Sequence, residues 1–206
     1  MDPKQPSWRN PHVPAEPTWD VALLFPEQGT WSEEEYLALG GNHLVEFSHG
    51  YVEVLPMPTD AHQAIVAYLY RTLLALLAAH HPGGVVRFAP LRLRLWPGKF
   101  REPDLMLLRD ARDPRRTPQF WQGADLVIEV VSSDDRRRDV VVKRREYAKA
   151  GIPEYWIVDP EEQRVTVLRI DGETYATHGE FARGDVATSA LLDEVMIDVT
   201  ATLDAD

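Results

Sequence analysis

The run Leu126–Val131 (LVIEVV) is apolar on both sides of a strand except at Glu129. A strand carries this pattern when helices cover both faces of its sheet, which is typical of α/β folds. A buried carboxylate without a partner costs several kcal/mol, so Glu129 needs a cation beside it. The run therefore predicts a covered central strand that carries one acidic group and its partner.

The segments around this strand indicate an α/β core with antiparallel additions. Ser32 with Glu35 forms a capping-box pattern before the first helix, and Asp60 can cap the second. Helices are expected at 33–39, at 61–81, which is apolar nearly all round, and from an N-cap at 132–135 to Ala150. Strands are expected at 44–47, 51–55, 85–96, 104–108, 125–131, 154–158, 164–170 and 174–177. The order helix, three strands, helix, strand predicts an α/β core with extra antiparallel strands at both ends.

The composition is typical of a single soluble domain. A chain of 206 residues can bury roughly 70% of its unfolded surface, so it needs no disulfide or metal to hold a core. The sequence has no Cys, which excludes disulfides, thiol catalysis and cysteine-bound metals and leaves the cytoplasm as the expected location. Six prolines in residues 1–28 predict an extended N-terminal arm, and residues 29–206 are expected to form the domain.

No membrane segment is expected. The N-terminus lacks the apolar stretch of a signal peptide. The longest apolar run, Ala64–Ala79, contains Arg71 and is shorter than the ~20 residues that a membrane span requires. We therefore interpret this run as a buried helix.

The net charge of −11 argues by itself against a nucleic-acid partner, since phosphate binding rests on Lys and Arg. Residues 85–149 nevertheless hold sixteen Lys and Arg against ten Asp and Glu, while the rest of the chain holds six against twenty-three. This basic middle segment is typical either of a phosphate-binding surface or of the solvated faces of a strand and a helix. Under the first interpretation, strand 85–95 and helix 136–149 supply the phosphate contacts.

Asp104 is the first candidate partner of Glu129 in a metal site. It follows Pro103 at the start of an expected strand, and an adjacent strand could bring the two carboxylates together. Two carboxylates, water and a substrate phosphate suit Mg²⁺, which keeps several waters. The alternative is a structural ion pair between Glu129 and Arg138 or Lys143.

Lys143 is the candidate catalytic lysine. Asp139, Lys143 and Tyr147 are spaced i, i+4, i+8 and share one face of the helix that follows Glu129. If this helix packs over the sheet, Lys143 can orient or deprotonate a water and stabilise charge on a phosphate. The alternative is a surface lysine. Glu46, flanked by apolar residues, is either a third metal contact or a structural carboxylate.

Several other site types have no support in the sequence. The histidines show no HxH or HExxH spacing, so a histidine-bound metal is not expected, and His62 is expected to cap or pack its helix. No GxxxxGK[ST], GxGxxG or GxSxG motif occurs, which argues against NTPases, dinucleotide-binding enzymes and serine hydrolases. A two-carboxylate glycosidase lacks the expected stripe of exposed aromatic residues.

The order and spacing of the motifs resemble one known family. The matching segments are ADLVIEVVS at 124–132, Arg138, Asp139, Lys143 and Tyr147, GIPEYWIVDP at 151–160, EPDL at 102–105, and the hairpin 44–54 with Glu46 and Gly50. Together they resemble the Uma-two (Uma2) family of restriction-endonuclease-like proteins, within the PD-(D/E)xK nuclease superfamily. The resemblance covers about residues 31–200.

The resemblance implies a restriction-endonuclease-like α-β-β-β-α-β core with a mixed central sheet flanked by helices. It implies that Asp104, Glu129 and the backbone carbonyl of Val130 hold Mg²⁺ or Mn²⁺. Val131 stands where the superfamily has its lysine, and Lys143 matches the position to which the family has moved it. The helix 61–81 contains no Glu, so the first-helix carboxylate of the superfamily would have its equivalent in Glu46.

The resulting hypothesis is a metal-dependent endonuclease that hydrolyses phosphodiester bonds of nucleic acid, with DNA as the expected substrate. The alternative is a catalytically silent protein of the same fold that binds nucleic acid or a protein. A homodimer is compatible with either, because restriction-type folds often pair, although no interface follows from these residues.

Overall fold

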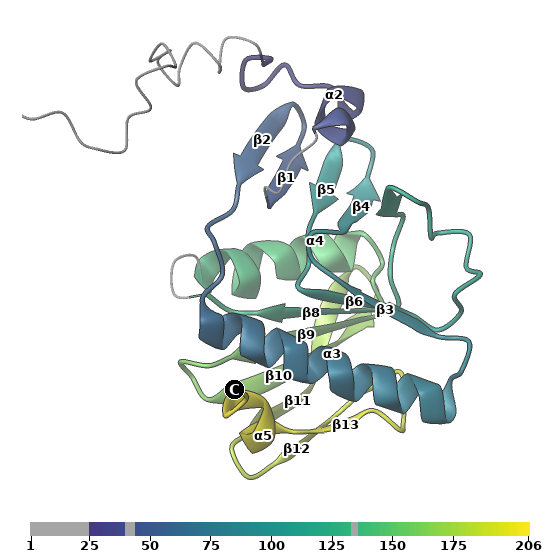
Figure 1. Ribbon diagram of the computed structural model, residues 1–206, viewed down its shortest axis with the longest axis vertical. Helices are drawn as coiled ribbons and strands as arrows, with labels where there is room; N and C mark the ends of the chain where they lie inside the picture. Colours follow the sequence, from purple (N-terminus) through teal and green to yellow (C-terminus); the bar gives the residue numbers. More distant parts are fainter. Residues whose placement is uncertain (1–24, 40–43, 133–135) are drawn as a thin grey trace, which may run out of the picture.

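A six-stranded mixed sheet forms the centre of the computed structural model, which describes residues 25–39, 44–132 and 136–206 (Figure 1). The helices are α2 (Glu33–Ala38), α3 (Asp60–His80), the π-helix η1 (Arg138–Lys143), α4 (Arg144–Lys149) and α5 (Val199–Leu203). The strands before η1 are β1 (Val45–Ser48), β2 (Tyr51–Val54), β3 (Val85–Phe88), β4 (Arg92–Trp96), β5 (Lys99–Arg101), β6 (Leu105–Leu108), β7 (Phe120–Trp121) and β8 (Leu126–Val130). The strands after α4 are β9 (Glu154–Asp159), β10 (Arg164–Asp171), β11 (Thr174–Ala182), β12 (Val186–Thr188) and β13 (Met196–Asp198).

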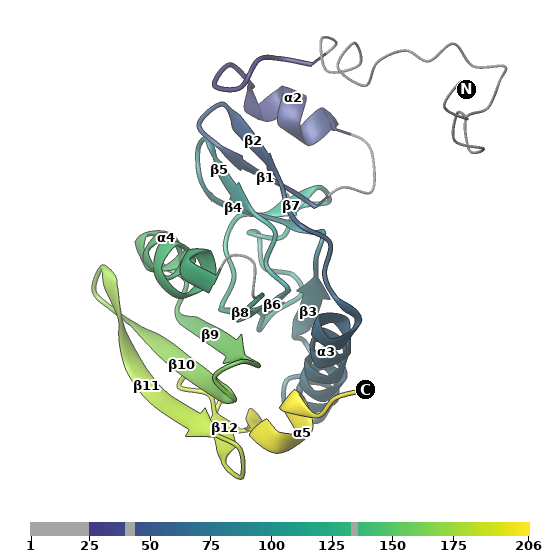
Figure 2. The same ribbon diagram turned by 90° about the vertical axis from the view of Figure 1, so that its left-hand side faces the viewer.

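The central sheet has the order β11-β10-β9-β8-β6-β3. Strands β3, β6 and β8 pair antiparallel, and β8 pairs parallel with β9. Helix α3 precedes β3, while η1 and α4 connect β8 to β9, and Figure 2 shows α3 and α4 on different sides of the sheet. The α-β-β-β-α-β core and its mixed sheet are therefore confirmed, with β10 and β11 as antiparallel additions.

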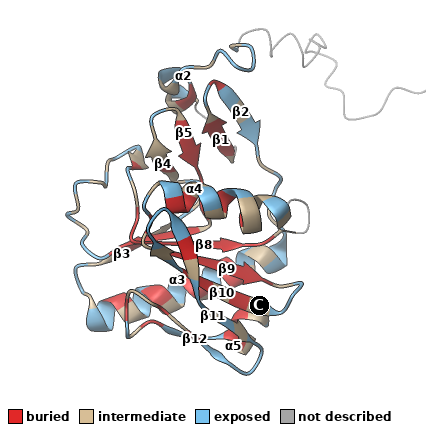
Figure 3. Cartoon of the chain, turned by 180° about the vertical axis from the view of Figure 1, so that it is seen from behind, coloured by how far each residue is buried: buried red, intermediate tan, exposed pale blue. Residues whose placement is uncertain are grey.

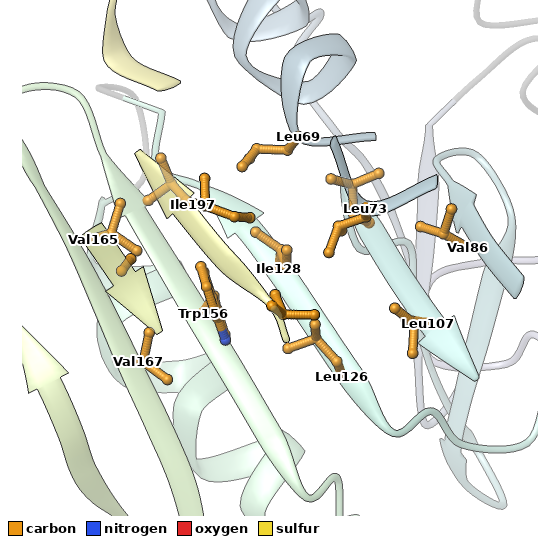
Figure 4. Close-up of a cluster of buried hydrophobic side chains, with 14 of the residues drawn as sticks. Leu69, Leu73, Val86, Leu107, Leu126, Ile128, Trp156, Val165, Val167 and Ile197 are labelled. Atoms are coloured by element: carbon orange, nitrogen blue, oxygen red, sulfur yellow. The ribbon is translucent and has the colours of Figure 1, made fainter. Parts of the chain in front are cut away.

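The alternation of side chains along β8 divides the core into two apolar clusters. Leu126 and Ile128 face α3, where Leu69, Leu73 and Trp156 belong to the same cluster (Figure 4). Val127 belongs to the cluster on the α4 face. Strands β6, β8 and β9 are correspondingly buried at every residue, and β8 and β9 are drawn in red in Figure 3. Both faces of β8 are covered, as the run LVIEVV predicts.

A second sheet, of order β2-β1-β5-β4-β7, lies beside the central one and is covered by α2. The predicted capping box is present, because the Ser32 hydroxyl accepts from the backbone of Glu35 and the Glu35 carboxylate accepts from the backbone of Ser32. Tyr36 of α2 stacks on Phe47 with 5.1 Å between ring centroids, and its hydroxyl donates to the carbonyl of Val45 over 2.8 Å. This small aromatic cluster fixes α2 on the hairpin β1-β2.

The prediction of a single strand at 85–96 is wrong. The chain breaks it into β3 and β4, which belong to different sheets. Pro90 lies at the break, and proline cannot donate a ladder hydrogen bond inside a sheet. Strands β4 and β5 are thereby inserted between β3 and β6 of the central sheet and belong to a second sheet.

Helix α3 differs from its prediction in two respects. Its N-cap is Thr59, not Asp60, because the Thr59 hydroxyl accepts from the backbone N–H of His62 over 3.2 Å. The helix is also buried on one stripe rather than all round, and Leu74 is 48% exposed. Among the residues that the structure describes, α3 is the one helix long and apolar enough to cross a membrane by length and composition, and its buried stripe packs on the sheet.

Other predicted features have mixed outcomes. Strands β10 and β11 are longer than expected. The short strands β5 and β7 have no expected counterpart, and neither do β12, β13 and α5. These last elements add Ala187, Ile197 and Val199 to the α3-face cluster. Most of the expected N-cap 132–135 and most of the expected N-terminal arm lie outside the described residues.

The Thr59 cap gives the first testable prediction. Thr59→Ala should lower the free energy of unfolding by about 1 kcal/mol, because the backbone N–H of His62 loses its acceptor. Asp60→Ala should cost less, since Asp60 only lies in the first turn of the helix. Urea unfolding of both variants measures this, and a larger loss for Asp60→Ala would restore Asp60 as the cap.

Candidate active site

Asp104 and Glu129 are brought together by the register of β6 and β8. The two strands pair antiparallel with Leu105 opposite Ile128, so the next pair along the ladder is Asp104 and Glu129. Asp104 Oδ2 accepts a hydrogen bond from the backbone N–H of Val130 over 2.8 Å. Both carboxylates line one cleft with a volume of about 340 Å³.

Lys143 reaches these acids from η1, the helical segment that follows β8 in the chain. Its Nζ lies 2.9 Å from Glu129 Oε2 and 2.8 Å from Asp139 Oδ1. The hydroxyl of Tyr147 donates to Glu129 Oε1 over 2.5 Å. All four side chains are buried. The face predicted from the spacing of Asp139, Lys143 and Tyr147 therefore meets Glu129.

The helix carrying Lys143 begins as a π-helix, η1. Asp139 and Lys143 both lie inside this segment. The hydroxyl of Tyr155, on β9, donates to the backbone carbonyl of Asp139 over 3.0 Å. π-Type turns occur frequently at functional sites, where they redirect side chains. Here the π-helical segment presents an acid and a lysine to the same strand.

The acids of this cluster crowd around one buried ammonium. Burial raises the pKa of the Glu129 carboxyl, the ammonium of Lys143 opposes this shift, and the carboxylates of Asp104 and Asp139 add to it. Burial alone would lower the pKa of Lys143, but Glu129 and Asp139 outweigh burial and raise it. Lys143 therefore stays an ammonium at neutral pH, while burial and the neighbouring acids favour the protonated form of the Glu129 carboxyl in the absence of a further cation.

His62 also belongs to the cluster, which the sequence did not indicate. Its Nε2 lies 3.2 Å from Asp104 Oδ2, and its side chain lines the same cleft. Burial lowers the pKa of the imidazole, but the hydrogen bond to Asp104 and the charges of Asp104 and Glu129 outweigh burial and raise it. Its side chain neither caps nor simply packs α3, because the capping oxygen belongs to Thr59.

Glu46 occupies a different environment. Its carboxylate is buried in ion pairs with Arg101 and Arg138 and does not line the cleft. Burial would raise the pKa of Glu46, but Lys143, Arg101 and Arg138 outweigh it and lower the pKa to about 2. The geometry thus favours the structural alternative for Glu46 over a metal contact.

Comparisons with known proteins give the family and the fold of this chain. The sequence model of the Uma2 family, described as "Putative restriction endonuclease", matches residues 33–200. The chain belongs to the Uma2 family. A solved structure described as "a putative nuclease belonging to DUF820", from Anabaena variabilis, has a TM-score of 0.68, 21% sequence identity, and coverage of 84% of this chain and 99% of that one. This likeness shows a shared nuclease-like fold. The search of curated proteins returned no match.

The basic middle segment of this Uma2-family chain is largely paired inside the structure. Arg92 lies over the ring of Tyr36, 4.3 Å from its centroid, and Arg94 pairs with Glu33 over 2.9 Å. Two arginines that were expected to contact phosphates from strand 85–95 therefore contact side chains of α2 instead. The described cleft residues include five carboxylates and two Lys or Arg, namely Glu102, Asp104, Glu129, Asp139 and Glu161 against Arg138 and Lys143.

The donor set of the cleft fits a hard divalent cation better than a histidine- or cysteine-type centre. Within the described ranges, no three His, Cys, Asp or Glu side chains converge as metal ligands. Mg²⁺ is commonly held by one or two carboxylates together with waters and substrate phosphates. Asp104 and Glu129 supply two carboxyl groups in a cleft lined by more acidic than basic side chains. The residues present therefore fit Mg²⁺ or Mn²⁺.

The buried pairing of Glu46 gives a stability prediction. Glu46→Gln should lower the free energy of unfolding by about 3 kcal/mol, because buried Arg101 loses one of its two carboxylate partners and keeps only Glu146. Glu53→Gln is the matched control: Glu53 pairs with Arg138 over 2.7 Å but has a side chain that is 60% exposed, so it should cost about 1 kcal/mol or less. Equal losses in urea unfolding would contradict the structural role of Glu46.

The same carboxylate predicts a pH dependence. The folded-state pKa of Glu46, about 2, lies below its ordinary value of 4.5. A lowered pKa stabilises the fold above the unfolded-state value, and this contribution is lost as the pH falls through the folded-state value. The stability difference between wild type and Glu46→Gln should therefore be full above pH 4.5 and shrink toward pH 2. Urea unfolding across this range measures it, and a constant difference would contradict the assignment.

Proposed function

We propose that this Uma2-family chain is a metal-dependent endonuclease that hydrolyses phosphodiester bonds of nucleic acid, with DNA as its substrate. The observation that carries the proposal is the meeting of Asp104, Glu129 and Lys143 in one cleft of a nuclease-like core. The family description and the fold likeness support nuclease chemistry at the coarser level.

The proposed metal is Mg²⁺ or Mn²⁺. Asp104, Glu129 and the backbone carbonyl of Val130 would hold it. Such an ion, when bound, lowers the pKa of a coordinated water and neutralises charge on a phosphate. The excess of carboxylates in the cleft supports this role, because a phosphodiester would otherwise meet repulsion there.

Lys143 would act as a charged donor. Because Glu129 and Asp139 raise its pKa, Lys143 is an ammonium and orients water or phosphate rather than removing a proton. Its two carboxylate partners fix the position of Nζ, and the hydroxyl of Tyr147 fixes Glu129 in turn. These hydrogen bonds hold the chain's own groups in place before a substrate arrives.

The cleft also offers apolar contacts to a nucleic acid. Leu44, Leu55, Met57 and Ile65 are among its lining residues, and Met57 is 81% exposed. Apolar side chains of this kind can contact sugars and bases, which carry no charge. This surface supports binding of a nucleic-acid strand at the cleft, where few Lys or Arg side chains are available to contact phosphates.

The test is cleavage of supercoiled plasmid and of single-stranded DNA with Mg²⁺, with Mn²⁺ or with EDTA. Wild type should cleave with metal and not with EDTA, and the Asp104→Asn/Glu129→Gln double variant should lose cleavage by at least about 100-fold, since the proposed metal loses both side-chain ligands. Asp110→Asn, which changes an exposed carboxylate outside the cleft, is the matched control.

Two results would contradict the proposal. Cleavage that persists in the double variant would place the chemistry elsewhere. Folded wild type that binds DNA without cleaving it under any metal would favour the catalytically silent alternative. That alternative has one observation in its favour, since Lys143, Glu129 and Tyr147 already pair with one another.

A further inference from the structure

We propose that His62 is a positioning residue of the metal site, which holds Asp104 so that its Oδ1 faces the cation. The inference rests on the proposed metal site at Asp104 and Glu129. It assigns a role to the one imidazole among the described residues of the cleft.

The two oxygens of Asp104 have different surroundings. Oδ2 accepts from the backbone N–H of Val130 over 2.8 Å and lies 3.2 Å from Nε2 of His62. In the described part of the chain, Oδ1 has no hydrogen-bond partner. With Oδ2 fixed from two sides, the carboxylate plane is set and Oδ1 is the oxygen left for a cation.

His62 is itself held in place by the fold. It lies in the first turn of α3, where its backbone N–H donates to the Thr59 hydroxyl. It precedes Ile65, Val66 and Leu69 by three, four and seven positions, and these residues form the buried stripe on the sheet. The imidazole therefore approaches Asp104 from a helix anchored on the face of the sheet opposite to η1 and α4.

The contact can form in two of the three states of the ring, and only the neutral form protonated at Nδ1 cannot make it. Nε2 carries a proton both in the protonated imidazole and in the neutral form protonated at Nε2. Nδ1 is buried and has no partner among the described residues, so Nε2 is the atom through which the ring acts. The side chains of His62 and Asp104 are 14% and 17% exposed, which limits competition from water.

The rival role for His62 is direct ligation of the metal through a ring nitrogen. The two roles differ in what a side-chain amide can replace. The amide N–H of Gln can donate to Asp104 Oδ2 in place of Nε2, whereas a Gln is a poor substitute for a coordinating imidazole. His62→Gln therefore separates positioning from ligation, and His62→Ala removes both.

The matched control is His81, at the other end of the same helix. Its Nε2 lies 3.1 Å from Glu194 Oε2, so it makes the same type of imidazole–carboxylate contact away from the cleft. His81→Ala thus reports the effect of losing such a contact on stability alone.

The experiment measures Mn²⁺ affinity of the full chain by electron paramagnetic resonance of free Mn²⁺, with urea unfolding of each variant alongside. His62→Ala should weaken binding about 10–100-fold, the usual effect of losing a group that orients a metal ligand. His62→Gln should stay close to wild type, and His81→Ala should bind as wild type does. Saturating Mn²⁺ should restore cleavage by His62→Ala.

Three outcomes would overturn the inference, and they are distinguishable. Unchanged affinity in His62→Ala, with wild type binding Mn²⁺, would reject the role of His62 and leave the proposed function standing. Equal loss in His62→Ala and His62→Gln would assign direct ligation instead. Absence of Mn²⁺ binding by folded wild type would reject the metal site and this inference together.

Discussion

The buried ammonium of Lys143 is the interaction on which the arrangement of the cleft depends. It joins Glu129 of β8 to Asp139 of the π-helix η1, so it fixes a helix to a strand at the same point where the acids converge. Neither acid would be tolerated in this apolar surrounding without it, because an unpaired buried carboxylate is costly. The same contact that allows Glu129 to be buried also places a cation beside Asp104. The structural role of Lys143 and its proposed chemical role therefore depend on the same contacts.

The features that the sequence could predict are those with a fixed local period. The alternation around Glu129 indicated a covered strand, and the spacing of Asp139, Lys143 and Tyr147 indicated one helical face. Asp104 followed from a weaker argument, an acid at the start of a neighbouring strand, and the β6–β8 register places it opposite Glu129. The capping box at Ser32 is likewise a purely local signal.

The remaining features depend on contacts between distant segments. No spacing connects His62 to Asp104, since they meet only when α3 packs on the sheet. Glu46 is buried, as its apolar neighbours predict, but its two arginine partners come from β5 and η1, which no local pattern connects to it. The π-helix leaves no local signature in the sequence. The break at Pro90 did have a signal, because proline is disfavoured inside a sheet, and the alternating residues after it concealed it.

The two sheets share an apolar cluster, in which Leu93 of β4 and Trp121 of β7 pack with Val127 of β8, and charged side chains also join them. Lys99 and Arg101 of β5 meet Glu146 of α4, while Arg138 of η1 meets Glu46 and Glu53 of the hairpin. Ion pairs of this kind add little net stability but are sensitive to direction and distance. Apolar packing thus joins the two sheets as well as filling each of them, and the ion pairs add a contact that depends on direction. The junction between the sheets therefore combines an apolar seam, which tolerates small shifts, with charge pairs, which do not.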